Sequence, residues 1–168
     1  MPHNRAIIVN TLTRSFVIGV SAGMRTQLPG AVLTSHLANG GLNRGHGPVW
    51  SLLRRGGSRK VATALALGEL VGDKLPMTPD RISGNAGLGR LLFGTIMGGL
   101  VASGVGARSG GLLLAAATGT VGGAVGSYGG YWARKSITGQ YGLPDLPVAL
   151  VEDAVAFSLA RLAVAREL

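Results

Sequence analysis

Four carboxylates interrupt runs of the sequence that otherwise read as apolar helix. Glu69 and Asp73 lie in "ALALGELVGDKLP", and Glu152 and Asp153 lie in "LPVALVEDAVAFSLARLAVA". On a soluble helix, such residues would mark the side that faces water. At the centre of a bilayer, a charge costs about 2.5 kcal/mol or more, so it normally faces other helices and pairs with an opposite charge. Carboxylates placed in this way are typical of pathways for protons or ions.

Arginines lie in similar surroundings and supply the opposite charge. Arg14 and Arg90 fall within apolar runs, and Arg161 falls in the last one. We expect Glu69 and Glu152 to face these arginines around a polar cavity that carries protons, ions or a small solute. The alternative is a set of buried ion pairs that fix the register of the helices and transport nothing.

That structural alternative suits three of the charges better. We expect Asp73, Asp153 and Arg161 to lie at the membrane interface, which long charged side chains reach from within a span.

A second pattern concerns packing. The segment "GTVGGAVGSYGG" repeats glycine at four-residue spacing, which is just over one helical turn. Such a stripe lets another helix backbone approach closely. We expect packing within the chain, with self-association into a homo-oligomer as the alternative. The stripe consists of Gly119, Gly122, Gly123, Gly126 and Gly130.

The composition indicates which solvent surrounds these residues. Hydrophobic residues make up 46% and charged residues only 14%, whereas a soluble domain has about 25% charged residues. The net charge of +9 fits either nucleic-acid binding or the basic loops of a membrane protein. Aromatic residues are only 5% and are not interleaved with the basic ones, so stacking platforms for bases are missing. We therefore expect the lipid bilayer, rather than nucleic acid, as the partner.

The elements that position these residues are expected to be helices, because Ala, Gly and Leu outnumber the β-branched residues that favour strands. We predict one all-α membrane domain over 1–168, a polytopic transmembrane bundle of about six segments. The segments are 6–24, 27–38, 61–75, 88–107, 110–132 and 146–165. The second and third are too short for an ordinary span, which indicates short, broken or re-entrant helices.

Loop charge predicts the orientation. The loop 39–60 carries five basic residues and no acid, so it is expected in the cytoplasm. Six crossings then place both termini there as well. The prediction is a multi-pass protein of the cell membrane.

Two short similarities suggest an internal repeat. "RSFVIGVSAG" and "RLLFGTIMGG" both place Arg nine residues before Gly, and "ALGE" and "ALVE" recur in the third segment after each Arg. With three crossings per half, the halves 1–75 and 88–168 would form a 3+3 inverted repeat. This layout recurs in transporters, which bind substrate where the halves meet.

Enzyme chemistry finds no support in the residue types. The chain has no cysteine, its three histidines lie far apart, and neither a phosphate loop nor a nucleophile elbow occurs. We expect no metal, no cofactor and no catalytic residue, with an acid–base enzyme embedded in the membrane as the alternative that the residue types leave open.

The motifs "GVSAGMRTQLPGAV", "GELVGDKLP" and "LPDLPVALVEDAVAF" resemble the small bacterial membrane proteins of the domain-of-unknown-function 4126 family. The resemblance covers about 11–163 and is weakest in the basic loop. It implies a polytopic membrane protein and brings no known activity. The charged residues that fall in the family's characteristic stretches are Arg25, Glu69, Asp73, Lys74, Glu152 and Asp153.

The leading functional hypothesis is a small transporter or channel-like protein with intramembrane carboxylates. The alternative is a structural or scaffolding membrane protein whose glycine stripes drive packing. A basic soluble protein that binds nucleic acid is the third class.

Overall fold

The computed structural model describes residues 2–72 and 84–165, with side chains over 10–72 and 87–165. These residues form seven helices and no strand, so the prediction of an all-α fold is confirmed. The helices are α1 (Pro2–Met24), α2 (Leu28–Ala38), α3 (Pro48–Leu53), α4 (Gly56–Gly72), α5 (Gly84–Gly104), α6 (Ser109–Gly139) and α7 (Asp145–Val164).

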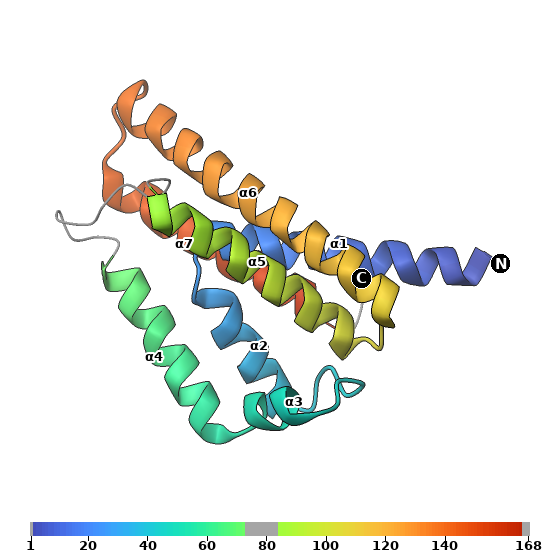
Figure 1. The fold of residues 1–168 in the computed structure, drawn as a ribbon. Helices are drawn as coiled ribbons and strands as arrows, with labels where there is room; N and C mark the ends of the chain where they lie inside the picture. The colour runs from blue at the N-terminus through green and yellow to red at the C-terminus, as the bar shows by residue number, and fades with distance from the viewer. Residues whose placement is uncertain (1, 73–83, 166–168) are drawn as a thin grey trace.

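The helices form two groups, which Figure 1 shows. Helices α1, α5 and α6 pack closely against one another, and α7 packs mainly against α1. Helix α2 packs against α7 and α4, so α4 reaches the main group through α2. In Figure 1, α4 stands apart from α5.

The glycines of α6 bring its backbone into contact with α1. A Cβ atom built on Gly122 would lie 2.3 Å from the carbonyl oxygen of Phe16, and one on Gly126 would lie 2.1 Å from that of Val20. Real side chains never approach so closely, so only glycine fits at these two positions without a shift of the helices.

The other face of the same stripe meets α5. A Cβ on Gly119 would lie 2.3 Å from the carbonyl oxygen of Gly94, and one on Gly123 would lie 3.2 Å from that of Arg90. Gly130 lies further along and faces the Glu152 side chain. The stripe therefore packs α6 between α1 and α5.

The predicted basic loop is partly helical, because 39–60 includes α3 and the first turn of α4. Trp50 of α3 is buried, and its Nε1 donates a hydrogen bond to Ser103 Oγ on α5 at 3.2 Å. The Arg54 guanidinium lies 5.4 Å from the Trp50 ring centroid and donates to the carbonyl oxygen of Gly45. One anchored tryptophan thus fixes this segment against the end of α5.

Helix α6 extends beyond the predicted segment 110–132, and its last turns occupy residues that were predicted to form a loop. No proline occurs between Ser109 and Pro144, so nothing interrupts the helix before Gly139. As a result, Arg134 lies on a helix instead of in a loop.

Polarity is distributed in an unusual way over the described residues. Large apolar side chains are exposed on α4, α5, α6 and α7, whereas Arg14, Arg25 and Arg90 are buried. Among the described helices, two are long and apolar enough to cross a membrane, over Gly87–Gly104 and Ser109–Gly139. The six-span arrangement and the inverted repeat stay predictions.

Candidate functional site

The site is built around a break between α1 and α2. Helix α1 ends at Met24, and α2 begins at Leu28 with Pro29 in its first turn. Pro29 lacks a backbone N–H, and inside a helix its ring would clash with the carbonyl group four residues earlier, so it is accommodated in the first turn of a new helix and not within a continuous one. Met24 lies beside Gly130 of α6, because a Cβ built on Gly130 would be 3.9 Å from Met24 Cγ. Helix α6 continues for nine more residues, which is about 13 Å at 1.5 Å per residue. The break therefore lies inside the bundle.

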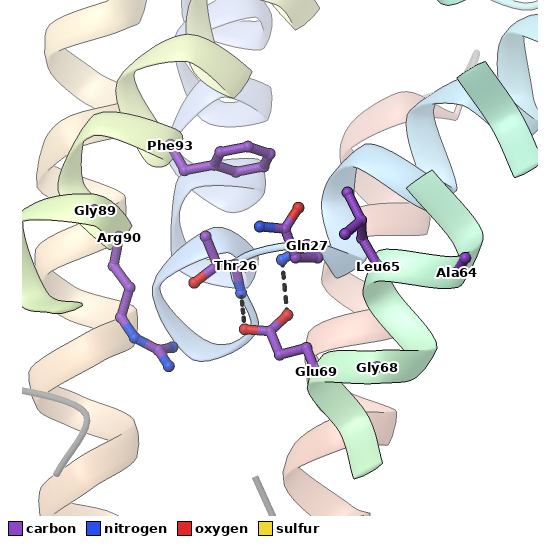
Figure 2. A pocket seen from close by; sticks show the side chains of 9 residues that line it. All are labelled: Thr26, Gln27, Ala64, Leu65, Gly68, Glu69, Gly89, Arg90 and Phe93. Carbon is purple, nitrogen blue, oxygen red and sulfur yellow. Dashed lines mark hydrogen bonds between the residues drawn. The ribbon is translucent and has the colours of Figure 1, made fainter. Parts of the chain in front are cut away.

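Glu69 of α4 binds the start of α2. Its two carboxylate oxygens accept hydrogen bonds from the backbone N–H groups of Thr26 and Gln27, each at 2.7 Å (Figure 2). These N–H groups precede the first turn of α2 and have no acceptor within the helix. A carboxylate at this position also interacts favourably with the positive end of the helix dipole.

Arg90 of α5 binds the end of α1. Its guanidinium donates to the carbonyl oxygens of Gly23 and Met24, at 2.8 and 3.1 Å. Arg90 is only 7% exposed, so its charge is held among protein groups. The cation therefore complements the negative end of α1, as the Glu69 anion complements the positive end of α2.

A cleft of about 700 Å³ opens beside these two contacts, between α4 and α5. Figure 2 shows Glu69 and Arg90 approaching the break from opposite sides, with Phe93 above them. The lining consists of Thr26, Gln27, Ala64, Leu65, Gly68, Glu69, Gly89, Arg90 and Phe93.

A second group of charges lies on the other side of the break. Arg25 is 0% exposed, and its Nε donates to Asp153 Oδ1 at 2.5 Å. A terminal nitrogen of Arg25 lies 3.6 Å from Glu152 Oε2, which is an ion pair beyond direct hydrogen-bond distance. Glu152 is also 3.8 Å from Arg134, and Arg134 forms a two-bond contact with the exposed Asp145. The network thus runs from the buried break to the surface.

The structure corrects the predicted pairing. Glu152 approaches Arg25 and Arg134, not Arg14, Arg90 or Arg161. Glu69 and Arg90 line the same cleft, and each binds backbone groups of the break there. Sequence spacing cannot reveal this outcome, because it depends on which helices become neighbours.

Two of the predicted basic residues lie elsewhere. Arg14 is buried, and its Nε donates to Asn10 Oδ1 one turn earlier on α1. Arg161 is exposed and lines a separate cleft of about 260 Å³ between α7, α2 and α4.

The two remaining acids have different outcomes. Asp153 was expected near a membrane interface, but its side chain is 14% exposed and pairs with the fully buried Arg25. Asp73 lies outside the described residues.

Sequence reasoning missed three features of the site. Arg134 was assigned to a loop, although the helical run without a breaker before Gly139 could have placed it on α6. The backbone N–H groups of Thr26 and Gln27 carry no sequence signal beyond the adjacent "LPG". Phe93 looked like any other apolar residue of its segment.

The described residues contain no group of three His, Cys, Asp or Glu side chains that could hold a metal ion. No family model, curated protein or solved structure matches the chain. The resemblance to the domain-of-unknown-function 4126 family therefore stays a prediction. The fold and the site define the class more simply, as an all-helical bundle with a charged helix break inside it.

Proposed function

We propose that this chain is an integral membrane protein that transports or conducts a small polar or ionic solute through the cleft beside the α1–α2 break. The observation that carries the proposal is that Glu69 and Arg90 line this cleft while binding the two ends of the broken helix. Broken helices whose ends meet polar groups near mid-membrane are a recurrent design of transporter binding sites.

The membrane part of the proposal is supported by the exposed surface. Leu113, Val121 and Val125 of α6 are about half exposed or more, and α7 exposes Leu150 and Phe157 similarly. A surface this apolar is unfavourable in water and suits lipid.

The two ends of α6 suggest where the membrane boundaries lie. Tyr128, Trp132 and Tyr141 are exposed toward its C-terminal end, as in an aromatic belt. Basic residues gather at the opposite end, where Arg44 donates to the carbonyl oxygen of Val105 just before α6 begins. We place that basic end in the cytoplasm.

The cleft favours a solute that competes for the hydrogen bonds between Glu69, Arg90 and the backbone of the break. A cation that binds Glu69 would weaken its hold on the N–H groups of Thr26 and Gln27. An anion would find those N–H groups and the Arg90 guanidinium. Solute binding would thus loosen the contacts that hold α4 and α5 to the break. In this way, a bound solute would favour opening of the cleft.

The test blocks the cleft without disturbing these contacts. Gly68 lines the cleft, and a Cβ built on it meets nothing within 4 Å. Gly68→Leu in proteoliposomes is expected to abolish proton, ion or solute flux while unfolding temperature is retained. The control is Gly129→Leu on α6, where a built Cβ also meets nothing within 4 Å and which does not line the cleft. Equal flux for wild type and Gly68→Leu, or no flux for wild type across a broad panel, would overturn the proposal.

A structural or scaffolding role is the second candidate. It is favoured by the same hydrogen bonds, because Glu69 and Arg90 both act as helix caps in the structure. In that case Glu69→Gln would lower the unfolding temperature in detergent, and no solute would cross the wild-type protein.

A further inference from the structure

An apolar groove of about 730 Å³ runs between α4 and α5, beyond the charged cleft. Helix α2 forms its floor, and α3 closes one end. Its walls are mostly aliphatic side chains, among them Leu33, Val61, Leu65, Ile96, Met97 and Leu100. Val61 and Ile96 are more than half exposed, so the groove is open along its length.

The charge of the groove is concentrated at the α3 end. Arg55 and Ser58 line it there, at the junction of α3 and α4. The neighbouring Arg54 is held by carbonyl oxygens of the preceding loop, whereas the Arg55 guanidinium makes no hydrogen bond or ion pair within the described part of the chain. Segment 39–60 contains no acid that could neutralise it.

We propose that this groove binds one anionic phospholipid of the surrounding bilayer, with an acyl chain between α4 and α5 and the phosphate at Arg55. Charge complementarity selects the head group, because a basic rim favours phosphatidylglycerol-type lipids over zwitterionic ones. The apolar walls favour an acyl chain, because the groove would otherwise expose aliphatic surface on both sides.

The length of the groove fits part of a lipid acyl chain. From Gly57 to Leu65 the groove follows α4 over eight residue steps, a rise of about 12 Å at 1.5 Å per residue. This is less than half of a hydrocarbon core of about 30 Å. The groove therefore holds the part of an acyl chain nearest the head group, from Arg55 to the end of the groove at Phe93. The groove adjoins the charged cleft and shares Gln27, Leu65 and Phe93 with it. The inference rests on the membrane part of the proposed function but does not depend on flux.

The experiment measures lipid retention on the full chain in detergent by native mass spectrometry. Phosphatidylglycerol and phosphatidylcholine with identical acyl chains are titrated against wild type and Arg55→Gln. Wild type is expected to retain one phosphatidylglycerol in preference to phosphatidylcholine. Arg55→Gln should lose about fivefold of this preference, since one basic residue near the surface contributes about that factor.

Arg59→Gln is the matched control, because Arg59 is exposed one turn away and does not line the groove. Its preference should stay close to wild type. An equal loss in Arg55→Gln and Arg59→Gln would show general surface attraction and overturn the assignment.

The apolar half of the site is tested on α5. Ile96→Gln removes part of the groove wall and should weaken retention of both lipids. Leu92→Gln changes a side chain that is 64% exposed one turn earlier and outside the groove, and it should retain lipid like wild type. Retention unchanged in Ile96→Gln would overturn the proposal. Dimers that exclude lipid in wild type would instead show that a second copy covers the groove.

Discussion

Buried arginines require partners in this chain, because an unpaired charge removed from water is strongly destabilising. Arg25 is fully buried and pairs with Asp153 and Glu152, while Arg90 satisfies two carbonyl oxygens at the end of α1. Individual contacts therefore differ greatly in their importance for stability, according to their depth.

Asp153→Asn tests the buried pair. The substitution leaves the Arg25 charge without its closest carboxylate, so we expect a loss of about 3–5 kcal/mol in the free energy of unfolding. Asp145→Asn removes the same charge from a 62% exposed aspartate, and there the loss should stay below about 1 kcal/mol. Both are measured by unfolding in detergent, and similar losses would contradict the importance of burial.

Glu69→Gln tests the cap on α2. A neutral amide keeps the size of the side chain, but one of the two accepting oxygens is replaced by an NH2 group that can only donate, so one of the two hydrogen bonds is lost together with the favourable charge at the helix end. The expected destabilisation is about 1–2 kcal/mol. Hydrogen exchange of the Thr26 and Gln27 amides should accelerate in the variant. Unchanged exchange at both amides would be inconsistent with the observed cap.

At the scale of elements, α6 organises the main helix group through its glycines. Two of them meet α1 and two meet α5, so their packing depends on backbone contact more than on interlocking side chains. Contacts of this kind tolerate no added atoms. The exposed side of the same helix has no such restriction, which allows a comparison within one element.

Gly126→Ala provides that comparison. Its Cβ would lie 2.1 Å from the carbonyl oxygen of Val20, so α1 and α6 must separate, with an expected loss of about 1–3 kcal/mol. Gly129→Ala adds the same methyl group where nothing lies within 4 Å, and it should be neutral or stabilise by up to about 1 kcal/mol. Thermal unfolding of the two variants gives the comparison. A stable Gly126→Ala protein would show that the helices are less closely packed than described.

At the scale of the whole molecule, the basic segment and the α5–α6 connection lie at one end. Gly106 approaches Arg44, and Gly104 approaches Trp50, so loops distant in sequence form a common surface. The α6–α7 connection lies at the opposite end in Figure 1. If the bundle spans a membrane, these two ends face different compartments.

The absence of cysteine from the chain makes this orientation directly testable. Ser51→Cys on α3 and Gln140→Cys after α6 place single thiols at exposed positions of the two ends. In intact cells, a membrane-impermeant maleimide should label Gln140→Cys and should label Ser51→Cys only after permeabilisation. Labelling of both without permeabilisation, or recovery of the protein in the soluble fraction without detergent, would contradict the membrane proposal.

The sequence by itself determined the helical class, the approximate helix positions and the candidate charges, because composition and breakers act locally. It predicted α2 almost to the residue, since Pro29 and the polar residues after Ala38 limit that helix. It also singled out Glu69, Glu152 and Arg90 as charges within apolar runs.

Only the tertiary structure decided which partner each charge meets. Glu69 binds backbone N–H groups of a broken helix, and Glu152 joins Arg25 and an arginine that had been assigned to a loop. Such pairings depend on which helix faces approach each other, and here glycine contacts between α1, α5 and α6 set that approach. The sequence shows that a charge inside an apolar run needs a partner. Which partner lies within reach depends on how the helices pack.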